Sequence, residues 1–244
     1  MNLSIIIPAH NEEGCLEETV SSIIKELDAE NINFDILVIN DNSADGTKSV
    51  CKKIKNKQQN FSYINRTSNP GFGIAVREGL AAFKGDVVAI VMADGSDSPL
   101  DIVACYRKIE EGYECAFGSR FIKGSNIKDY PYLKLFINRI ANKFIQALFN
   151  IPYNDVTNAF KIYRREVIEH AYPLLSVHFN LTVEIPLKAI IRGFTYAVVP
   201  ISWINRKKGT SKLAMKEMGS RYLFIVLYLF LEKILSKGDY LRKN

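Results

Sequence analysis

The chain has 244 residues, 48% of them hydrophobic, so it can bury the core of one large α/β domain with an appendage. Its formal net charge is +6, and the stretch 206–244 alone contributes ten Lys or Arg against three Asp or Glu. This basic tail has no motif that reads bases and its aromatic residues lie in an apolar run, which argues against a nucleic-acid binder. The four cysteines show no metal-ligand spacing and no secretory signal is recognised, which predicts a cytoplasmic protein.

Strands and helices alternate through the first half of the chain. Short Val- and Ile-rich runs predict buried strands, and apolar residues spaced three and four apart predict helices between them. This alternation is typical of right-handed βαβ units on a mostly parallel, Rossmann-like sheet flanked by helices. The expected strands cover 5–8, 34–39, 61–65, 86–92 and 114–118, and the expected helices cover 15–30, 47–57, 74–83 and 100–111.

The pattern changes after residue 120. A polar loop at 123–129 precedes an amphipathic helix at 132–149, and a basic loop at 205–212 precedes a C-terminal helix. Between them we expect strands at 159–163 and 196–201, and helices at 165–172 and 183–192.

The C-terminal helix contains ten consecutive uncharged residues at 222–231. A helix that spans a membrane needs about 20 apolar residues, so this run indicates an interfacial or a packing helix. The basic residues beside it fit peripheral attachment to an anionic membrane surface. Packing on the body of the protein, or on a second subunit of a homo-oligomer, explains the run equally well.

Two acidic clusters directly follow expected strands. Asp41 follows the second strand, and Asp94 and Asp97 follow the fourth. Open α/β sheets bind ligands just beyond the carboxyl ends of their parallel strands. Carboxylates at that edge can hold a hard divalent cation that neutralises a diphosphate, so the sequence predicts a nucleotide site. Ser98 is expected to cap the helix that begins at Pro99, whereas Asp97 is either a cap or a ligand.

Seven short motifs, in this order, resemble those of the family-2 glycosyltransferases of the GT-A fold. The closest likeness is to polyprenyl-phosphate sugar synthases of the dolichol-phosphate-mannose type, and it runs from about residue 2 to residue 213. One such motif is weak evidence, but the ordered set is specific. The motifs are Ile7-Pro8-Ala9-His10-Asn11-Glu12-Glu13, Val38-Ile39-Asn40-Asp41-Asn42-Ser43, Asn69-Pro70-Gly71-Phe72-Gly73, the segment 92–99, Gly118-Ser119-Arg120-Phe121, Asn138-Arg139-Ile140-Ala141-Asn142 and the segment 205–212.

The resemblance implies a catalytic domain at 1–213, with a nucleotide-binding half at 1–119 and an acceptor-binding half at 120–213, followed by the helix at 214–244. It implies that the nucleotide sugar is bound by Pro8, His10, Glu12, Ile39, Asp41, Arg77, Ala93 and Asp94. The family usually has an aromatic or aliphatic residue where His10 stands. The alternative for His10 and Glu12 is that they cap the helix that follows.

By the same resemblance, Mg²⁺ or Mn²⁺ would be held by Asp94 and Ser96, with Asp97 as an extra carboxylate. Met92 occupies the position of the family's first aspartate, which should weaken cation binding. Asp94, Arg206 and Lys212 are the expected catalytic residues. The positively charged side chains of Arg206 and Lys212 would close over the donor diphosphate. The acceptor would be bound by Arg120, Arg139, Glu184 and Ser211, although Glu184 is alternatively a structural carboxylate.

The family likeness predicts transfer of a hexose to a polyprenyl or dolichyl phosphate at the cytoplasmic face of a membrane. GDP-mannose is the favoured donor, and UDP-glucose or another UDP-hexose is its rival. A phosphate monoester is largely dianionic near neutral pH, so it can attack without a base and invert the anomeric configuration. Two alternatives are a soluble enzyme that extends a saccharide with Glu184 or Asp155 as base, and an inactive nucleotide-sugar-binding protein.

Overall fold

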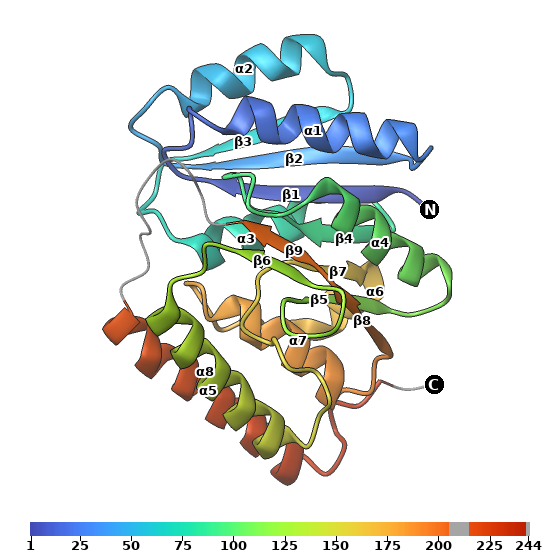
Figure 1. Cartoon of the computed structure of the whole chain (residues 1–244), viewed down its shortest axis with the longest axis vertical. Coiled ribbons are helices and arrows are strands. Elements are labelled where there is room, and N and C mark those ends of the chain that lie inside the picture. The colour runs from blue at the N-terminus through green and yellow to red at the C-terminus, as the bar shows by residue number, and fades with distance from the viewer. Residues whose placement is uncertain (205–214, 243–244) are drawn as a thin grey trace.

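The computed structural model describes residues 1–204 and 215–242. Within them, a seven-stranded sheet has the order β3-β2-β1-β4-β7-β5-β8, and β7 alone runs antiparallel to its neighbours (Figure 1). The expected mostly parallel α/β architecture is therefore confirmed. The strands are β1 (Leu3–Ala9), β2 (Phe34–Asp41), β3 (Phe61–Arg66), β4 (Val87–Ile90), β5 (Cys115–Ser119), β7 (Lys161–Arg164) and β8 (Tyr196–Pro200).

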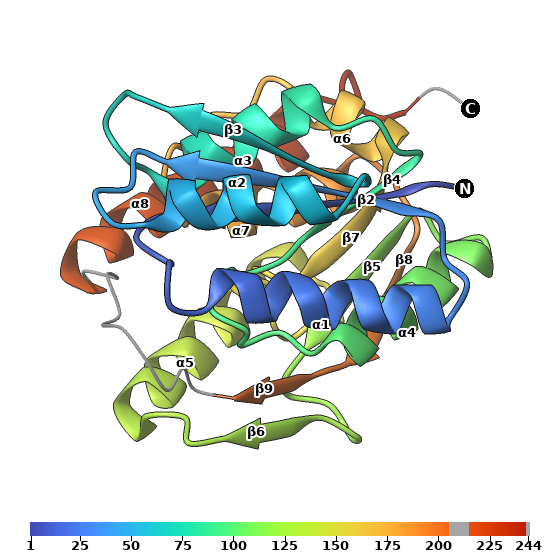
Figure 2. The ribbon, with the colours of Figure 1, turned by 90° about the horizontal axis from the view of Figure 1, so that it is seen from above.

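Helices cover both faces of the sheet, which is why its central strands are apolar on both sides (Figure 2). One face packs on α1 (Leu16–Ala29), α2 (Thr47–Lys57) and α4 (Pro99–Glu110). The other face packs on α3 (Phe72–Ala82), α5 (Tyr132–Phe149), α6 (Arg165–Ala171), α7 (Leu181–Ile191) and α8 (Met215–Leu235). All seven residues of β1 are buried, because this strand lies in the middle of both cores.

The strand order places a switch point at β1. From β1 the chain builds outward to β2 and β3, and then returns to add β4 on the opposite side of β1. In open α/β sheets, such a reversal leaves a crevice beyond the carboxyl ends of the two central strands. The polar loops that follow β1, β2 and β4 meet at this edge.

A second, two-stranded parallel sheet lies beyond this edge. It pairs β6 (Asn126–Lys128) with β9 (Ser202–Ile204), and Asp97 forms an isolated bridge to Trp203. We did not expect either strand, since the residues of β6 were assigned to a polar loop. A three-residue strand is too short to show a recognisable alternation of apolar and polar residues. The pairing of β6 with β9 also depends on the fold of the long segment between them. The expected halves 1–119 and 120–213 share the seven-stranded sheet, because β7 and β8 from the second half pair with strands of the first half.

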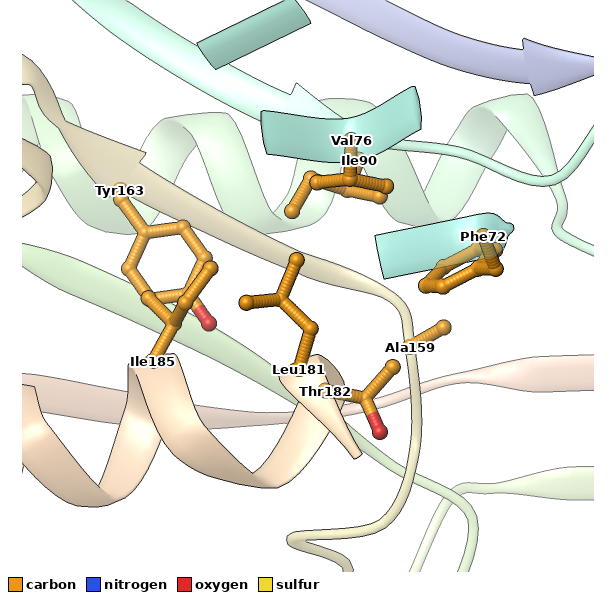
Figure 3. A pocket seen from close by; sticks show the side chains of 8 residues that line it. All are labelled: Phe72, Val76, Ile90, Ala159, Tyr163, Leu181, Thr182 and Ile185. Carbon is orange, nitrogen blue, oxygen red and sulfur yellow. The ribbon is translucent and has the colours of Figure 1, made fainter. Parts of the chain in front are cut away.

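The core beneath the site is closely packed between α3 and α7. A void of about 10 Å³, roughly the room of one water molecule, lies among mostly apolar side chains from α3, β4, β7 and α7 (Figure 3). Beside it the rings of Phe72 and Phe179 stack with centroids 4.1 Å apart. Gly73 allows this approach, because a Cβ there would come within 2.6 Å of the His178 carbonyl oxygen.

We predict that Gly73→Ala lowers the free energy of unfolding by about 1–3 kcal/mol, since the methyl group would overpack a backbone contact. Helix propensity alone would favour alanine by about 1 kcal/mol, so the sign of the change is informative. The measurement is urea denaturation followed by circular dichroism. Gly14→Ala is the matched control, because a Cβ at Gly14 meets nothing within 4 Å. A stabilised Gly73→Ala protein would contradict the packing described.

Candidate active site

A cavity of about 1010 Å³ opens at the carboxyl edge of the sheet. One part of its wall is polar and comes from the loops after β1, β2 and β4, with His10, Glu12, Asp41, Asp94 and Asp97. A second part of the wall comes from α5, α8 and the loops at 157–159 and 178–179, and it is mostly apolar. The cavity therefore joins a carboxylate-rich end to a hydrophobic end.

The loops after β1 and β2 are braced against each other. Asn11 accepts a hydrogen bond from the Ala44 N–H at 2.8 Å, and the Glu12 N–H donates to the Thr47 hydroxyl at 2.9 Å. The Gly46 N–H donates to the Glu13 carboxylate at 2.6 Å. Asn11 and Glu12 thus hold the neighbouring loop, and α1 begins at Leu16 without a side-chain cap from the described residues.

His10 and Asp41 are positioned by backbone contacts at the cavity wall. The Nδ1 atom of His10 lies 2.7 Å from the Asp41 carbonyl oxygen, and because a carbonyl oxygen only accepts, Nδ1 is the donor. The Asp41 carboxylate accepts hydrogen bonds from Arg66 and, at 2.7 Å, from the Gly71 N–H. A carboxylate has about four acceptor positions, and these two bonds occupy about half of them.

Asp94 and Asp97 lie on the turn between β4 and α4. The Asp94 carboxylate accepts the Ser96 N–H at 3.1 Å, and the Asp97 carboxylate accepts the Met92 N–H at 2.9 Å. Asp97 is therefore not the cap of α4. Pro99 does occupy the first turn of that helix, but Ser98 makes no side-chain capping bond among the described residues, contrary to expectation.

The acidic residues of this turn fit a divalent cation only together with ligand oxygens. The described residues contain no group of three or more His, Cys, Asp or Glu side chains that could hold a metal. Mg²⁺ is commonly bound by one or two carboxylates together with substrate phosphates, and Asp94 and Asp97 supply that number. Burial, with smaller effects from Asp94 and Asp101, raises the pKa of Asp97 to about 7.

Arg120 is fixed in the cavity wall by a buried ion pair. Its guanidinium donates to both oxygens of Asp155, at 2.8 and 2.7 Å, and also to the Tyr130 hydroxyl at 3.2 Å. Asn138 donates to the same hydroxyl at 2.6 Å, and the Tyr130 ring packs on Trp203 with centroids 4.7 Å apart. This network connects the end of β5 to α5 and β9.

Glu184 lies apart from these residues. Its carboxylate is fully buried, accepts the N–H groups of Leu175 and Ser176, and forms an ion pair with Lys188 at 2.7 Å. Although burial acts in the opposite direction, the bonds from Lys188 and Leu175 lower the pKa of Glu184. The described wall of the cavity does not include this residue, so its contacts match the alternative of a structural carboxylate.

The structure brings together some of the expected site residues and separates others. Pro8, His10, Glu12, Asp41, Asp94, Ser96, Asp97 and Arg120 line the cavity. Ile39 lies in the core, Ala93 contributes a carbonyl group that accepts the Thr19 hydroxyl, and Arg77 and Arg139 lie outside the described cavity wall. Arg206, Ser211 and Lys212 lie outside the described residues.

Lys161 is a buried residue that holds two backbone segments of the cavity wall together. Its buried ammonium group donates to the carbonyl oxygens of Val156, Asn158 and Thr182. Pro186 lacks the N–H group that would otherwise bond to Thr182 inside α7, and Lys161 replaces it. One buried lysine therefore fixes both the 156–158 loop and the start of α7.

Sequence reasoning missed the cavity residues on α5 and α8, among them Lys134 and Arg221. A usable signal was present, because the cavity-lining positions of α5 are 134, 137, 138, 141, 144 and 145, which recur at helical spacing. The partner of Arg120 was not recognisable in the same way, since Asp155 is 35 residues away in the chain.

Comparison with known proteins agrees with this geometry. The family model described as glycosyl transferase family 2 matches residues 4–171. A polyprenol monophosphomannose synthase of Mycolicibacterium smegmatis is 28% identical over 216 residues, which cover 86% of this chain and 80% of that protein. A dolichol-phosphate mannosyltransferase of Pyrococcus furiosus is 30% identical over 223 residues, 88% of this chain, and the match spans 60% of the length of that relative.

Solved structures share the fold. Glucosyl-3-phosphoglycerate synthase from Mycobacterium tuberculosis, crystallised with Mn²⁺, UDP-glucose and phosphoglyceric acid, superposes with a TM-score of 0.69. The match covers 95% of this chain and 79% of that one at 16% identity. At that identity the likeness speaks for the fold alone, and the expected GT-A type architecture is confirmed.

We predict that Asp97→Asn increasingly stabilises the protein as pH rises from 4 to 8 in buffer without divalent cations. The pKa of Asp97 is raised from 3.8 to about 7 on folding, so the folded wild type binds the proton more tightly and loses stability as the pH rises through this window. Between pH 4 and pH 8, the difference in unfolding free energy between Asp97→Asn and wild type should grow by on the order of 3 kcal/mol. Urea denaturation across the pH series measures it, with Asp28→Asn as an exposed control. Parallel curves for wild type and Asp97→Asn would contradict the prediction.

Proposed function

This chain belongs to glycosyl transferase family 2, and we propose that it transfers a hexose from a nucleotide diphosphate sugar to a polyprenyl phosphate. The names of the two relatives favour a mannose donor, GDP-mannose, and UDP-glucose is the alternative. The observation that carries the proposal is the cavity itself, which joins carboxylates at the sheet edge to an apolar wall on α5 and α8. A sugar nucleotide matches the first end, and an isoprenoid lipid matches the second.

The proposed donor site uses the polar end of the cavity. Asp41 would accept ribose hydroxyl protons with its remaining acceptor positions, and His10 would contact the base. Asp94, with Ser96 and Asp97, would hold Mg²⁺ or Mn²⁺, which when bound supplies positive charge that neutralises the diphosphate. Arg206 and Lys212 belong to the segment that joins β9 to α8, two elements at the cavity, and we propose that they bind the same diphosphate.

In the proposed reaction, an oxygen of the lipid phosphate attacks the anomeric carbon. The new bond joins that oxygen to carbon, the bond from carbon to the donor diphosphate breaks, and the nucleoside diphosphate leaves. The attack needs no protein base, because the second pKa of a phosphate monoester is about 6. This fits the site, since the bases considered for a saccharide acceptor are buried and paired: Glu184 with Lys188, and Asp155 with Arg120.

The lipid acceptor requires contact with a membrane. Among the described residues no helix has the length and apolarity to span one. Side chains on α5 and α8 nevertheless form an exposed apolar surface, which we call the α5–α8 face: Tyr132, Leu133, Phe136, Ile137, Ile140, Phe144, Leu223, Phe224, Leu227, Tyr228, Leu231, Ile234 and Leu235.

The α5–α8 face fits peripheral attachment to an anionic membrane. Soluble monomers rarely expose large apolar patches, and the α8 residues of this face belong to the stretch 206–244, where positive charge is concentrated. Lys237 is exposed at the end of α8, and Arg139 lies beside the apolar residues of α5. We therefore propose a peripheral enzyme at the cytoplasmic face of a membrane.

We predict that the protein, supplied with GDP-mannose or UDP-glucose, a polyprenyl phosphate and Mg²⁺ or Mn²⁺, forms a lipid-phosphate hexose of inverted configuration. Asp94→Ala should reduce the rate at least 100-fold, since the diphosphate loses its cation. Asp28→Ala, on the exposed end of α1, should leave the rate unchanged. Radiolabelled donor and thin-layer chromatography measure the product. Retention of configuration, or transfer to saccharides alone, would refute the proposal.

We further predict that Leu133→Glu weakens binding to vesicles containing phosphatidylglycerol roughly tenfold, because burial of an exposed leucine is worth about 1.5–3 kcal/mol. Leu100→Glu is the matched control, since Leu100 on α4 is 63% exposed and Leu133 is 66% exposed. Vesicle co-sedimentation measures both. Equal losses in the two variants would show that the α5–α8 face is not the contact surface.

A further inference from the structure

We propose that Arg66 is a positioning residue of the donor site, which holds the Asp41 carboxylate in the orientation that accepts the hydroxyl groups of a ribose. This inference rests on the proposed function, in which Asp41 contacts the ribose of the nucleotide. Arg66 was not among the site residues expected from the sequence. The described cavity wall includes Asp41 but not Arg66, so Arg66 would act on the ligand through Asp41.

Arg66 and Asp41 are neighbours because they end adjacent parallel strands. Asp41 is the last residue of β2 and Arg66 is the last residue of β3, and the two are paired in the register of the sheet (Figure 2). They form an ion pair in which each side chain is only 4% exposed. Because the pair is buried, salt in the solvent screens it little, and removal of one partner leaves the other charge without compensation.

The Arg66 guanidinium is engaged through all three of its nitrogen atoms. Its Nη1 atom donates to the Asp41 carboxylate, and its Nη2 atom donates to the Ser68 hydroxyl at 2.6 Å. Its Nε atom forms an ion pair with the Glu78 carboxylate at 3.0 Å. Ser68 lies in the loop between β3 and α3, and Glu78 lies on α3. A planar guanidinium suits three partners in fixed directions, whereas a lysine ammonium group is a compact point charge.

The second oxygen of the Asp41 carboxylate is held by the loop that Arg66 fastens. The Gly71 N–H donates to this oxygen at 2.7 Å, and Gly71 directly precedes α3. The segment that carries Gly71 is attached to Arg66 on both sides, through Ser68 before it and Glu78 after it. Arg66 therefore fixes one oxygen of Asp41 directly and the other through Gly71.

The orientation of this carboxylate decides how well it selects a ligand. The terminal torsion of an aspartate side chain has a broad distribution, so a carboxylate without such bonds can rotate. One bond at each oxygen sets the plane of the Asp41 carboxylate and leaves acceptor capacity for the adjacent hydroxyl groups of a ribose. A site built to bond a hydroxyl group strongly rejects an analogue that lacks it. Preference for ribose should therefore depend on Arg66 as well as on Asp41.

The test is isothermal titration calorimetry of the full chain with GDP and 2′,3′-dideoxy-GDP in the presence of Mn²⁺. The corresponding UDP pair replaces them if UDP binds more tightly. Wild type should bind the ribose form about tenfold or more tightly than the dideoxy form, because hydrogen bonds to a charged group are lost with the hydroxyls. Arg66→Gln should bring the two affinities to within about threefold of each other, as should Asp41→Ala. The double variant should lose no more of the preference than Asp41→Ala alone, since Arg66 acts through Asp41.

Arg192→Gln is the matched control. Arg192 is also a buried arginine that forms an ion pair with a carboxylate, at 2.9 Å from Glu232, but it lies outside the described cavity wall. Its loss should lower stability and leave the ratio of the two affinities unchanged. Arg66→Lys replaces Arg66→Gln should the latter fail to fold. It keeps the buried positive charge but not the three directed contacts, so it should also lower the ratio.

The possible outcomes separate this inference from the proposed function. A ratio that stays at the wild-type value in a folded Arg66 variant would overturn the role of Arg66. An equal fall of the ratio in Arg192→Gln would overturn it too, because lost stability would then be the cause. Hexose transfer by the wild type would leave the proposed function intact in both cases. A wild type that binds neither GDP nor UDP would overturn the proposed function itself.

Discussion

The buried pair between Arg120 and Asp155 is the interaction on which the arrangement of the site depends. Arg120 directly follows β5, and Asp155 lies in the loop between α5 and β7, so the pair joins the end of a sheet strand to this loop. Through Tyr130 and Asn138 the same guanidinium holds the beginning of α5. Loss of one partner from such a pair typically costs 3–5 kcal/mol, because the remaining charge is buried without compensation. The pairing of Arg120 with Asp155 therefore positions the part of the cavity wall to which Arg120 belongs.

With α5 fixed in this way, a polar and an apolar environment meet inside one cavity. The turn between β4 and α4 supplies Asp94 and Asp97, whereas the helices supply side chains such as Phe144 and Val226. A reaction between a water-soluble sugar nucleotide and a membrane lipid needs this combination, because each substrate must reach the other without leaving its own solvent. The family membership and the cavity therefore support the same chemistry from independent observations.

Much of this structure was predictable from the sequence, and the rest was not for identifiable reasons. Periodicity alone gave α2 and α5 with their observed bounds, since both helices have one strongly apolar face. The acidic turns after β2 and β4 were recognised because short polar clusters directly follow buried strands. In contrast, the roles of Glu184 and Arg120 depend on partners chosen by the fold. The short strands β6 and β9 likewise owe their existence to each other, across a separation of more than 70 residues.

The position of β7 has a consequence for how the chain is made. Within the described sheet, β5 is hydrogen-bonded to β7 and β8, both of which are synthesised after it, and β7 is what connects β5 to β4. A nascent chain that has reached residue 119 therefore holds a finished strand with no neighbour to bond to. Closure of the sheet must wait for residues 161–164 to emerge from the ribosome, so residues 1–119 alone cannot complete the seven-stranded sheet.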